Sequence, residues 1–165
     1  MATISDIERL GAELAVRNLI AKIFLLTDTD PELDEYRACF TEDAIWERVG
    51  EGAGQIIGSH TTGRAVGRET IIADRRAVRK ALHTGPATPR WHMATNTCVS
   101  VESADAARAW TSWIFVDAET VPATVSSVGY YQDDFRRTAD GWKLTHRRFS
   151  VGKPPAELSP RSKTA

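Results

Sequence analysis

The chain has 165 residues, of which 42% are hydrophobic and 26% are charged, with a formal net charge of -1. This is the length of one ordinary globular domain, which buries roughly 70% of the surface of its unfolded chain. The near-neutral charge argues against a nucleic-acid partner, and no apolar run is long enough to span a membrane.

Two cysteines, Cys39 and Cys98, lie far apart in the sequence and follow no metal-ligand spacing. The N-terminal residues lack the basic and then apolar pattern of a secretion signal. We therefore expect a cytoplasmic protein with reduced thiols.

The first predicted element is a long helix from about Ser5 to Leu26. Ser5 and Glu8 have the spacing of a capping box. Apolar residues recur near the helical period at Ile7, Leu10, Leu14, Ile20 and Ile23. Because residues 19–26 are almost continuously apolar, this end of the helix should be buried on most sides.

Two acids follow the helix. Asp30 precedes Pro31, a pair typical of the N-cap and first turn of a second helix, which we expect to run to Phe40. Asp28 has no such task. It either caps the first helix locally or points into a cavity and meets a cation or an imidazole, since an unpaired buried carboxylate is costly.

The middle of the chain predicts a strand over Asp43–Val49, a glycine-rich segment over Gly50–Gly63 with a short strand at Gln55–Ile57, and a third helix over Gly67–Leu82. The glycines follow neither a dinucleotide nor a phosphate-loop spacing. Four basic residues at helical spacing indicate a solvated face of the third helix: Arg75, Arg76, Arg79 and Lys80.

The next predicted strand, Arg90–Val101, carries the most informative pattern. Because alternate residues of a strand share a face, small and polar residues lie on one side and bulk suited to packing lies on the other. The small and polar set is His92, Ala94 and Asn96, and the bulky set begins with Trp91 and Met93. His92 is then either a core histidine with a satisfied hydrogen bond or the reactive group of a cavity.

The last third predicts three more strands, over Ala106–Val116, Val128–Thr138 and Trp142–Phe149, with an Asp140-Gly141 turn before the last. The loop between the first two is either a lid or a long hairpin. Three helices followed by antiparallel strands predict an α+β fold. Residues 152–165 have little to bury and are expected to be a mobile tail.

Four segments together resemble a known family: the helix end at Leu-Leu-Thr-Asp28, Phe40–Trp46, Arg90–Asn96 and Asp140–Leu144. They are similar to a SnoaL-like protein of the nuclear transport factor 2-like superfamily, nearest to the branch of scytalone dehydratase, bile-acid 7α-dehydratase and lindane dehydrochlorinase. The resemblance covers residues 1–151 as a single domain. It implies a cone-shaped barrel, in which a strongly curved antiparallel sheet is wrapped around about three helices and encloses one deep pocket.

The resemblance also implies a catalytic dyad of His92, the general base, and Asp28, which holds its tautomer. This is chemically sensible, because an imidazole with a pKa of about 6.5 suits proton transfer near neutral pH and a buried carboxylate stabilises the imidazolium. Ile23 stands where related lyases carry a lysine or tyrosine, so an acid at that position is not expected and Ile23 becomes a pocket wall.

Further pocket candidates follow from the same comparison. Arg147 either polarises a leaving group or carbonyl or is salt-bridged at a sheet edge, and Tyr131 is an acid or a wall, with Tyr130 replacing it if the register is off by one. Substrate-binding candidates beside Ile23 are Trp113, Phe115, Asn96, Asp133 and Phe149.

These residues predict a lyase, a dehydratase or other β-elimination enzyme, that acts on a small, mainly apolar, aromatic or polycyclic molecule. We expect no cofactor and no metal, because the histidines form no compact ligand motif, and no nucleic acid or membrane partner. An isomerase or polyketide cyclase would use the same base. A non-catalytic β subunit of a ring-hydroxylating dioxygenase, or a small-molecule binding protein, is the other alternative.

The resemblance further implies a homo-oligomer, a dimer or trimer formed through the outer face of the sheet. Trp110, on the face opposite Trp113, is the bulk that would suit such an interface.

Overall fold

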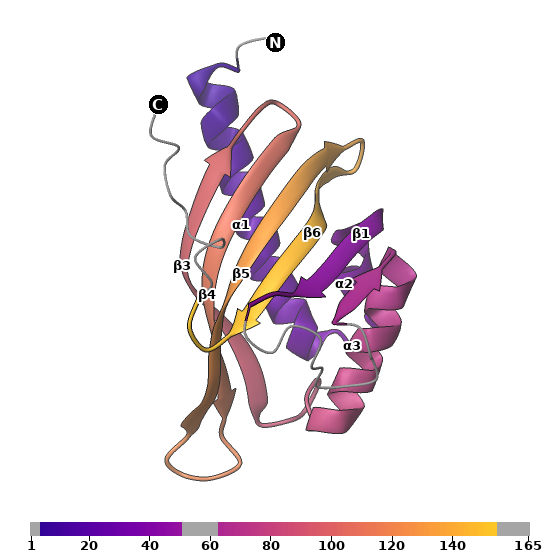
Figure 1. Ribbon diagram of the computed structural model, residues 1–165, viewed down its shortest axis with the longest axis vertical. Helices are drawn as coiled ribbons and strands as arrows, with labels where there is room; N and C mark the ends of the chain where they lie inside the picture. Colours follow the sequence, from indigo (N-terminus) through magenta and orange to yellow (C-terminus); the bar gives the residue numbers. More distant parts are fainter. Residues whose placement is uncertain (1–3, 51–62, 155–165) are drawn as a thin grey trace.

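The computed structural model describes residues 4–50 and 63–154, which form one curved sheet and three helices (Figure 1). The six strands have the order β2-β1-β6-β5-β4-β3. Neighbours are antiparallel except β1 and β6, which are parallel. The predicted α+β cone is confirmed, with two differences: β1 and β6 are parallel, and β2 and β3 remain at opposite edges, so the sheet of the described residues is not closed.

Helix α1 spans Asp6–Thr29 and begins with the predicted capping box. The Ser5 hydroxyl accepts the Glu8 N–H, and the Glu8 carboxylate accepts the Ser5 N–H, so two otherwise unpaired donors of the first turn are satisfied. The helix lies along the concave side of the sheet (Figure 1). Its last turn therefore delivers Asp28 to the inside of the cone.

The apolar stripe of α1 is not the predicted one in its first half. Ile7, Leu10 and Leu14 are exposed, whereas the face against the sheet is made by Ala12, Val16, Ile20 and Ile23. At 100° per residue, positions 12 and 16 lie almost opposite Leu14, so small residues, not leucines, face β3.

Helix α2 is only Asp34–Ala38, shorter than the predicted helix from Pro31 to Phe40. Asp30 still performs the predicted capping, because its carboxylate accepts the N–H groups of Leu33 and Tyr36 at 3.1 and 2.9 Å. Leu33 has a φ of +63°, which delays the start of the helix, and the chain enters β1 at Phe40.

Strand β1 covers Phe40–Arg48, and the three-residue β2, Arg64–Val66, which the sequence reading missed, pairs with it. The predicted strand at Gln55–Ile57 and residues 155–165 of the predicted tail lie outside the described residues. Helix α3 spans Arg68–Leu82 as predicted, with Gly67 at its N-cap.

The basic face predicted for α3 is wrong at two of its four positions. Arg79 turns toward α1 and donates hydrogen bonds to the carbonyls of Leu26, Thr27 and Asp30. These carbonyls lie at the C-terminal end of α1, where backbone acceptors lack a full set of partners and a cation is favourable, and only that of Leu26 also accepts the N–H of Asp30. Arg75 is also buried, at 9% exposed.

The remaining strands form an antiparallel meander of β3 (Arg90–Val101), β4 (Ala106–Asp117), β5 (Thr124–Thr138) and β6 (Gly141–Val151). All four were predicted, with ends that differ by a few residues. The segment between β4 and β5 is a hairpin connection, and β5 begins four residues earlier than expected.

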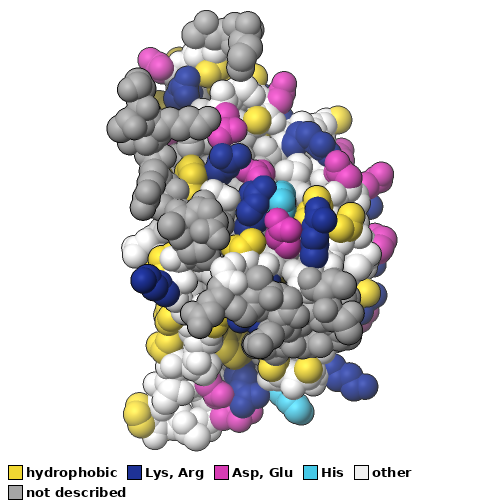
Figure 2. Space-filling view, in the orientation of Figure 1, with side chains coloured by type: hydrophobic (Ala, Val, Ile, Leu, Met, Phe, Trp, Pro, Cys, Tyr) yellow, Lys and Arg dark blue, Asp and Glu magenta, His cyan; other side chains and the backbone are white. Residues whose placement is uncertain are grey.

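The face of the molecule in Figure 2 carries basic and acidic side chains interspersed over the sheet. Cross-strand pairs account for part of this pattern, such as the pairing of Asp134 with both Arg108 and Arg148. Trp91 and Met93, expected to be packed, are exposed, and Trp110 is half-buried. No helix among the described residues combines the length and apolar character needed to cross a membrane.

Candidate functional site

Asp28 and His92 meet at the junction of α1 and β3. Oδ1 of Asp28 lies 2.9 Å from Nδ1 of His92, and Oδ2 accepts the His92 backbone N–H over 2.6 Å. Asp28, in the last turn of α1, thus fixes both the backbone and the imidazole ring of His92 at the start of β3. A carboxylate held in this way accepts the Nδ1 proton and leaves the Nε2 lone pair for a substrate.

The His92 imidazole is enclosed. Its side chain is 14% exposed, and the Phe115 ring centroid is 4.6 Å from its own. Burial lowers the pKa of His92, the hydrogen bond that the imidazole makes to the Asp28 carboxylate opposes this, and the charges of Arg75 and Arg147 lower the pKa further. The imidazole is therefore neutral at neutral pH, which is the form that a general base requires.

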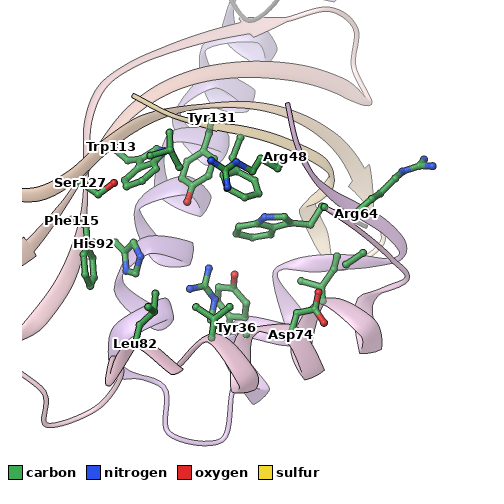
Figure 3. Close-up of a pocket in the computed structure, with 18 of the residues that line it drawn as sticks. Tyr36, Arg48, Arg64, Asp74, Leu82, His92, Trp113, Phe115, Ser127 and Tyr131 are labelled. Carbon is green, nitrogen blue, oxygen red and sulfur yellow. The ribbon is translucent and has the colours of Figure 1, made fainter. Parts of the chain in front are cut away.

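His92 lines a cavity of about 340 Å³ between the concave face of the sheet and helices α2 and α3 (Figure 3). Six of the residues that line it are aromatic: Tyr36, Trp46, Trp113, Phe115, Tyr131 and Phe149. In Figure 3, Tyr131 reaches into the space from the sheet and Tyr36 from the opposite side, with His92 and Phe115 at one end. The described residues thus bring together five of the predicted site residues: His92, Trp113, Phe115, Tyr131 and Phe149.

Trp113 and Tyr131 stack with centroids 5.8 Å apart, and β5 makes room for the indole with Gly129, the cross-strand partner of Trp113. A Cβ on Gly129 would collide with the indole ring. The register also settles the choice of tyrosine, because Tyr131 is buried in the cavity wall and Tyr130 is on the other face. Burial raises the pKa of Tyr131 to about 12, so its hydroxyl stays protonated.

Arg147 is buried on the predicted face of β6, but it is not among the residues that line the cavity. Its guanidinium forms a bidentate ion pair with Asp133, with Nε–Oδ1 and Nη2–Oδ2 distances of 2.8 and 2.6 Å. It also lies over the Tyr131 ring, 4.1 Å from the centroid. The pair sits between central strands, not at a sheet edge. A catalytic part for Arg147 remains a prediction.

Three predicted binding residues do not line the cavity. Asn96 is exposed, because β3 gains one residue relative to β4 between Ala94 and Thr97 and its inward face changes from even to odd positions. The expectation that Asn96 shares a face with His92 is therefore wrong. Ile23 is fully buried in the core and does not line the cavity, and Asp133 is taken up by Arg147.

The sequence reading missed several polar residues that line the cavity, among them Arg75 and Tyr36. Arg75 from α3 lies with its Cζ 5.4 and 5.9 Å from the ring centroids of Trp46 and Tyr36. Tyr36 is fully buried, and its hydroxyl has no hydrogen-bond partner in the described part of the chain.

Within residues 4–50 and 63–154, no group of three or more histidine, cysteine, aspartate or glutamate side chains is arranged to hold a metal ion. The two cysteines are free, Cys39 buried and Cys98 exposed.

Residues 8–148 match the family described as the SnoaL-like domain. The chain belongs to this family. The match covers most of the sequence and confirms the predicted family. No curated protein matches the SnoaL-like chain in sequence.

Solved structures similar to this SnoaL-like chain include an NTF2-like protein with a cystatin-like fold from Novosphingobium aromaticivorans, with a TM-score of 0.72, 23% identity, and coverage of 90% of this chain and 87% of that one. LinA has a TM-score of 0.67 at 16% identity, with coverage of 96% and 99%. A scytalone dehydratase-like protein from N. aromaticivorans has a TM-score of 0.64 at 15% identity, with coverage of 90% and 89%.

At these identities the likeness shows the fold alone. The neighbours also include proteins of unknown function and an aromatic ring hydroxylase-like protein. The SnoaL-like fold thus occurs with dehydratase and dehydrochlorinase neighbours as well as with others.

Proposed function

We propose that this SnoaL-like domain is a cofactor-independent lyase that eliminates water, halide or another small group from an aromatic or polycyclic substrate. The observation that carries the proposal is the 2.9 Å contact of Asp28 with Nδ1 of His92, at the end of an enclosed aromatic cavity. A neutral imidazole with one nitrogen held and the other available is a general base.

In the proposed reaction, Nε2 of His92 takes a proton from the carbon next to an activating group. The electron pair of that C–H bond forms the new double bond as the bond to the leaving group breaks. For a hydroxyl group the proton returns from Nε2 and water departs, whereas for a halide the proton goes to solvent. Asp28 stabilises the imidazolium that exists between these events.

Tyr131 is the proposed hydrogen-bond donor to the activating oxygen or the leaving group. Its pKa of about 12 keeps the hydroxyl protonated through the reaction. Arg147 does not line the cavity, so its proposed part is positioning: the guanidinium under the Tyr131 ring, itself fixed by Asp133, holds the tyrosine in place.

The size and walls of the cavity support an apolar bicyclic substrate. About 340 Å³ is at the lower end of the usual range for small-molecule sites, and six aromatic residues line it. A β-hydroxytetralone is a direct probe, because loss of water gives a naphthol with a distinct absorbance. The β-chloro analogue reports halide elimination through chloride release.

The test compares the wild-type chain with His92→Ala and with His83→Asn, a change at an exposed histidine. We expect His92→Ala to lower kcat for naphthol formation by about a thousandfold, in the range of general-base catalysis, with an unchanged circular dichroism spectrum. His83→Asn should behave as wild type. Equal turnover by His92→Ala would remove the lyase proposal.

Product analysis decides between elimination and the rivals that share its first step. An isomerase would return the proton to another carbon, and a cyclase would form a carbon–carbon bond, so neither would release water or chloride. A β subunit of a ring-hydroxylating dioxygenase would show no turnover as a purified chain.

We also propose that the chain forms a dimer or trimer through the outer face of the sheet. The exposure of Trp91 and Met93 on that face supports this. Sedimentation of the wild type and of Trp91→Ser tests it, with a monomeric wild type as the contradicting outcome.

A further inference from the structure

Arg75 is a buried cation that has no counter-ion within residues 4–50 and 63–154. Arg75 is 9% exposed, and its guanidinium lies against the ring faces of Trp46 and Tyr36. Within the described residues it donates no hydrogen bond and forms no ion pair. A guanidinium removed from water in this way is unfavourable unless something pairs with it, and cation–π contacts offset only part of the cost.

The other enclosed arginines of this region do not share this property. Arg147 is held by both oxygens of Asp133, and Arg79 donates to the carbonyls at the end of α1. Burial by itself therefore does not explain the state of Arg75, since the same fold supplies acceptors to its neighbours. What distinguishes Arg75 is that it borders the cavity.

A second donor without a partner belongs to the same wall. The Tyr36 hydroxyl is buried, has no hydrogen-bond partner in the described chain, and points toward the interior of the cavity in Figure 3. The Tyr36 ring is also one of the two that lie against Arg75. The Arg75 guanidinium and the Tyr36 hydroxyl thus border one part of the cavity, and neither donates a hydrogen bond to an acceptor among the described residues.

We propose that Arg75 and Tyr36 form an anion subsite that binds a carboxylate of the substrate, so that the lyase acts on an aromatic or polycyclic carboxylic acid. The guanidinium matches the two oxygens of a carboxylate, and the tyrosine hydroxyl adds a third donor. The aromatic wall holds the ring system between this subsite and His92. That the bound carboxylate belongs to a substrate rests on the proposed function, whereas the anion subsite itself does not.

The charge of Arg75 also acts on His92, whose pKa it lowers. A carboxylate that binds Arg75 compensates this charge. Occupation of the subsite would therefore make the imidazole a stronger base when a substrate is present.

The test measures binding and needs no turnover. The probes are 2-naphthoate and 2-naphthamide, which have the same ring system and nearly the same size, and of which only the first is an anion at neutral pH. Trp46 and Trp113 line the cavity, so binding is followed by tryptophan fluorescence and checked by calorimetry. The variants are Arg75→Met, Arg75→Lys and Tyr36→Phe, with Arg76→Met as the control at the next, exposed position.

We expect the wild type to bind 2-naphthoate at least about tenfold more tightly than 2-naphthamide, as a charge-assisted pair implies. Arg75→Met should remove this preference. Arg75→Lys should keep part of it, because the charge remains and the fork is lost. Tyr36→Phe should weaken 2-naphthoate binding by about threefold to tenfold and leave 2-naphthamide unchanged. Arg76→Met should match the wild type.

Equal binding of the two probes by the wild-type chain would overturn the subsite, and that comparison requires no variant to fold. An undiminished preference in Arg75→Met would overturn it as well. If the wild type prefers 2-naphthoate but His92→Ala eliminates as fast as the wild type, the subsite stands and the lyase proposal falls. If His92-dependent elimination occurs without the preference, the reverse holds.

Discussion

The buried polar groups on the two sides of the cavity, some of them behind its wall, differ in whether the protein supplies their partners. On the side of the sheet and α1, each functional charge has its partner within the chain: Asp28 holds His92, and Asp133 holds Arg147. On the side of α2 and α3, Arg75 and the Tyr36 hydroxyl have no partner among the described residues. The protein thus supplies the partners of the polar groups on the sheet side, whereas the polar groups Arg75 and Tyr36 on the helix side, called the open side below, are available to a ligand.

This difference separates two uses of buried polarity. A paired group is oriented before any ligand arrives, and removing its partner leaves an uncompensated charge. An unpaired group makes the free protein less stable and acquires its partner on binding. The sheet side should therefore be sensitive to the loss of either partner, and the helix side should be tolerant in the free protein and sensitive only when a ligand is present.

The largest expected effect is on stability, from Asp133→Asn. Loss of the carboxylate charge leaves Arg147 buried without a counter-ion, and we expect the free energy of unfolding to fall by about 3–5 kcal/mol. Urea unfolding monitored by tryptophan fluorescence measures it. The double variant Asp133→Leu with Arg147→Met, which removes both charges, should recover most of the loss. A stable Asp133→Asn would mean that the pair is not what holds this part of the sheet.

The next effect is on catalysis, from Asp28→Asn. The amide cannot stabilise an imidazolium and can present an N–H to Nδ1, which would move the imidazole proton to Nε2 and occupy the nitrogen that acts as base. We expect kcat/KM for elimination to fall by about a hundredfold or more. Binding of 2-naphthoate should change little, because Asp28 is not part of the open side. A parallel loss of binding would show that the two sides are not separate.

The sequence could predict the dyad because both of its residues stand in local patterns that survive folding. Asp28 follows a buried helix end and has no capping task, and His92 opens a strand whose first residues alternate regularly. The family resemblance then predicted that Asp28 and His92 form a pair. Asn96 was misplaced because a single extra residue in β3 reverses the inward face, and nothing in the sequence of that strand marks where the bulge lies.

Arg75 could not be predicted because adjacent basic residues on a helix look alike from the sequence. Arg75, Arg76 and Lys80 have the spacing of a solvated face, and only the packing of α3 over the cavity decides which of them is buried. Arg147 was placed on the correct face, but its partner came from the cross-strand register with Asp133, a contact that depends on how two strands align.

A smaller effect is on the pH dependence of activity, and its sign differs between Asp28 and Arg75. Activity requires neutral His92, so kcat/KM should fall as the pH drops through the His92 pKa, which burial holds below the ordinary value of about 6.5. Asp28 raises this pKa, whereas Arg75 and Arg147 lower it. Asp28→Asn should therefore move the acid limb to lower pH, and Arg75→Met should move it to higher pH.

The measurement is a pH profile of kcat/KM for each variant, with the His92 ring resonances followed by NMR as a check that needs no activity. Arg76→Met is the matched control, because its guanidinium is exposed and bonds to the carbonyl of Glu32. Shifts of the His92 pKa with the same sign in Asp28→Asn and Arg75→Met would contradict the opposite effects assigned to Asp28 and Arg75.

The smallest expected effect is on the stability of the free Arg75→Met variant, and it tests the contrast with Arg147 most directly. Methionine fills similar space between Trp46 and Tyr36 without a desolvated charge, so the free energy of unfolding should lie within about 1 kcal/mol of the wild type or above it. With saturating 2-naphthoate the order should reverse, since a ligand stabilises only the protein that binds it. Thermal unfolding with and without the ligand measures both. If Arg75→Met is as unstable as Asp133→Asn, Arg75 is a structural residue like Arg147, and the side of the cavity formed by α2 and α3 does not reserve it for a ligand.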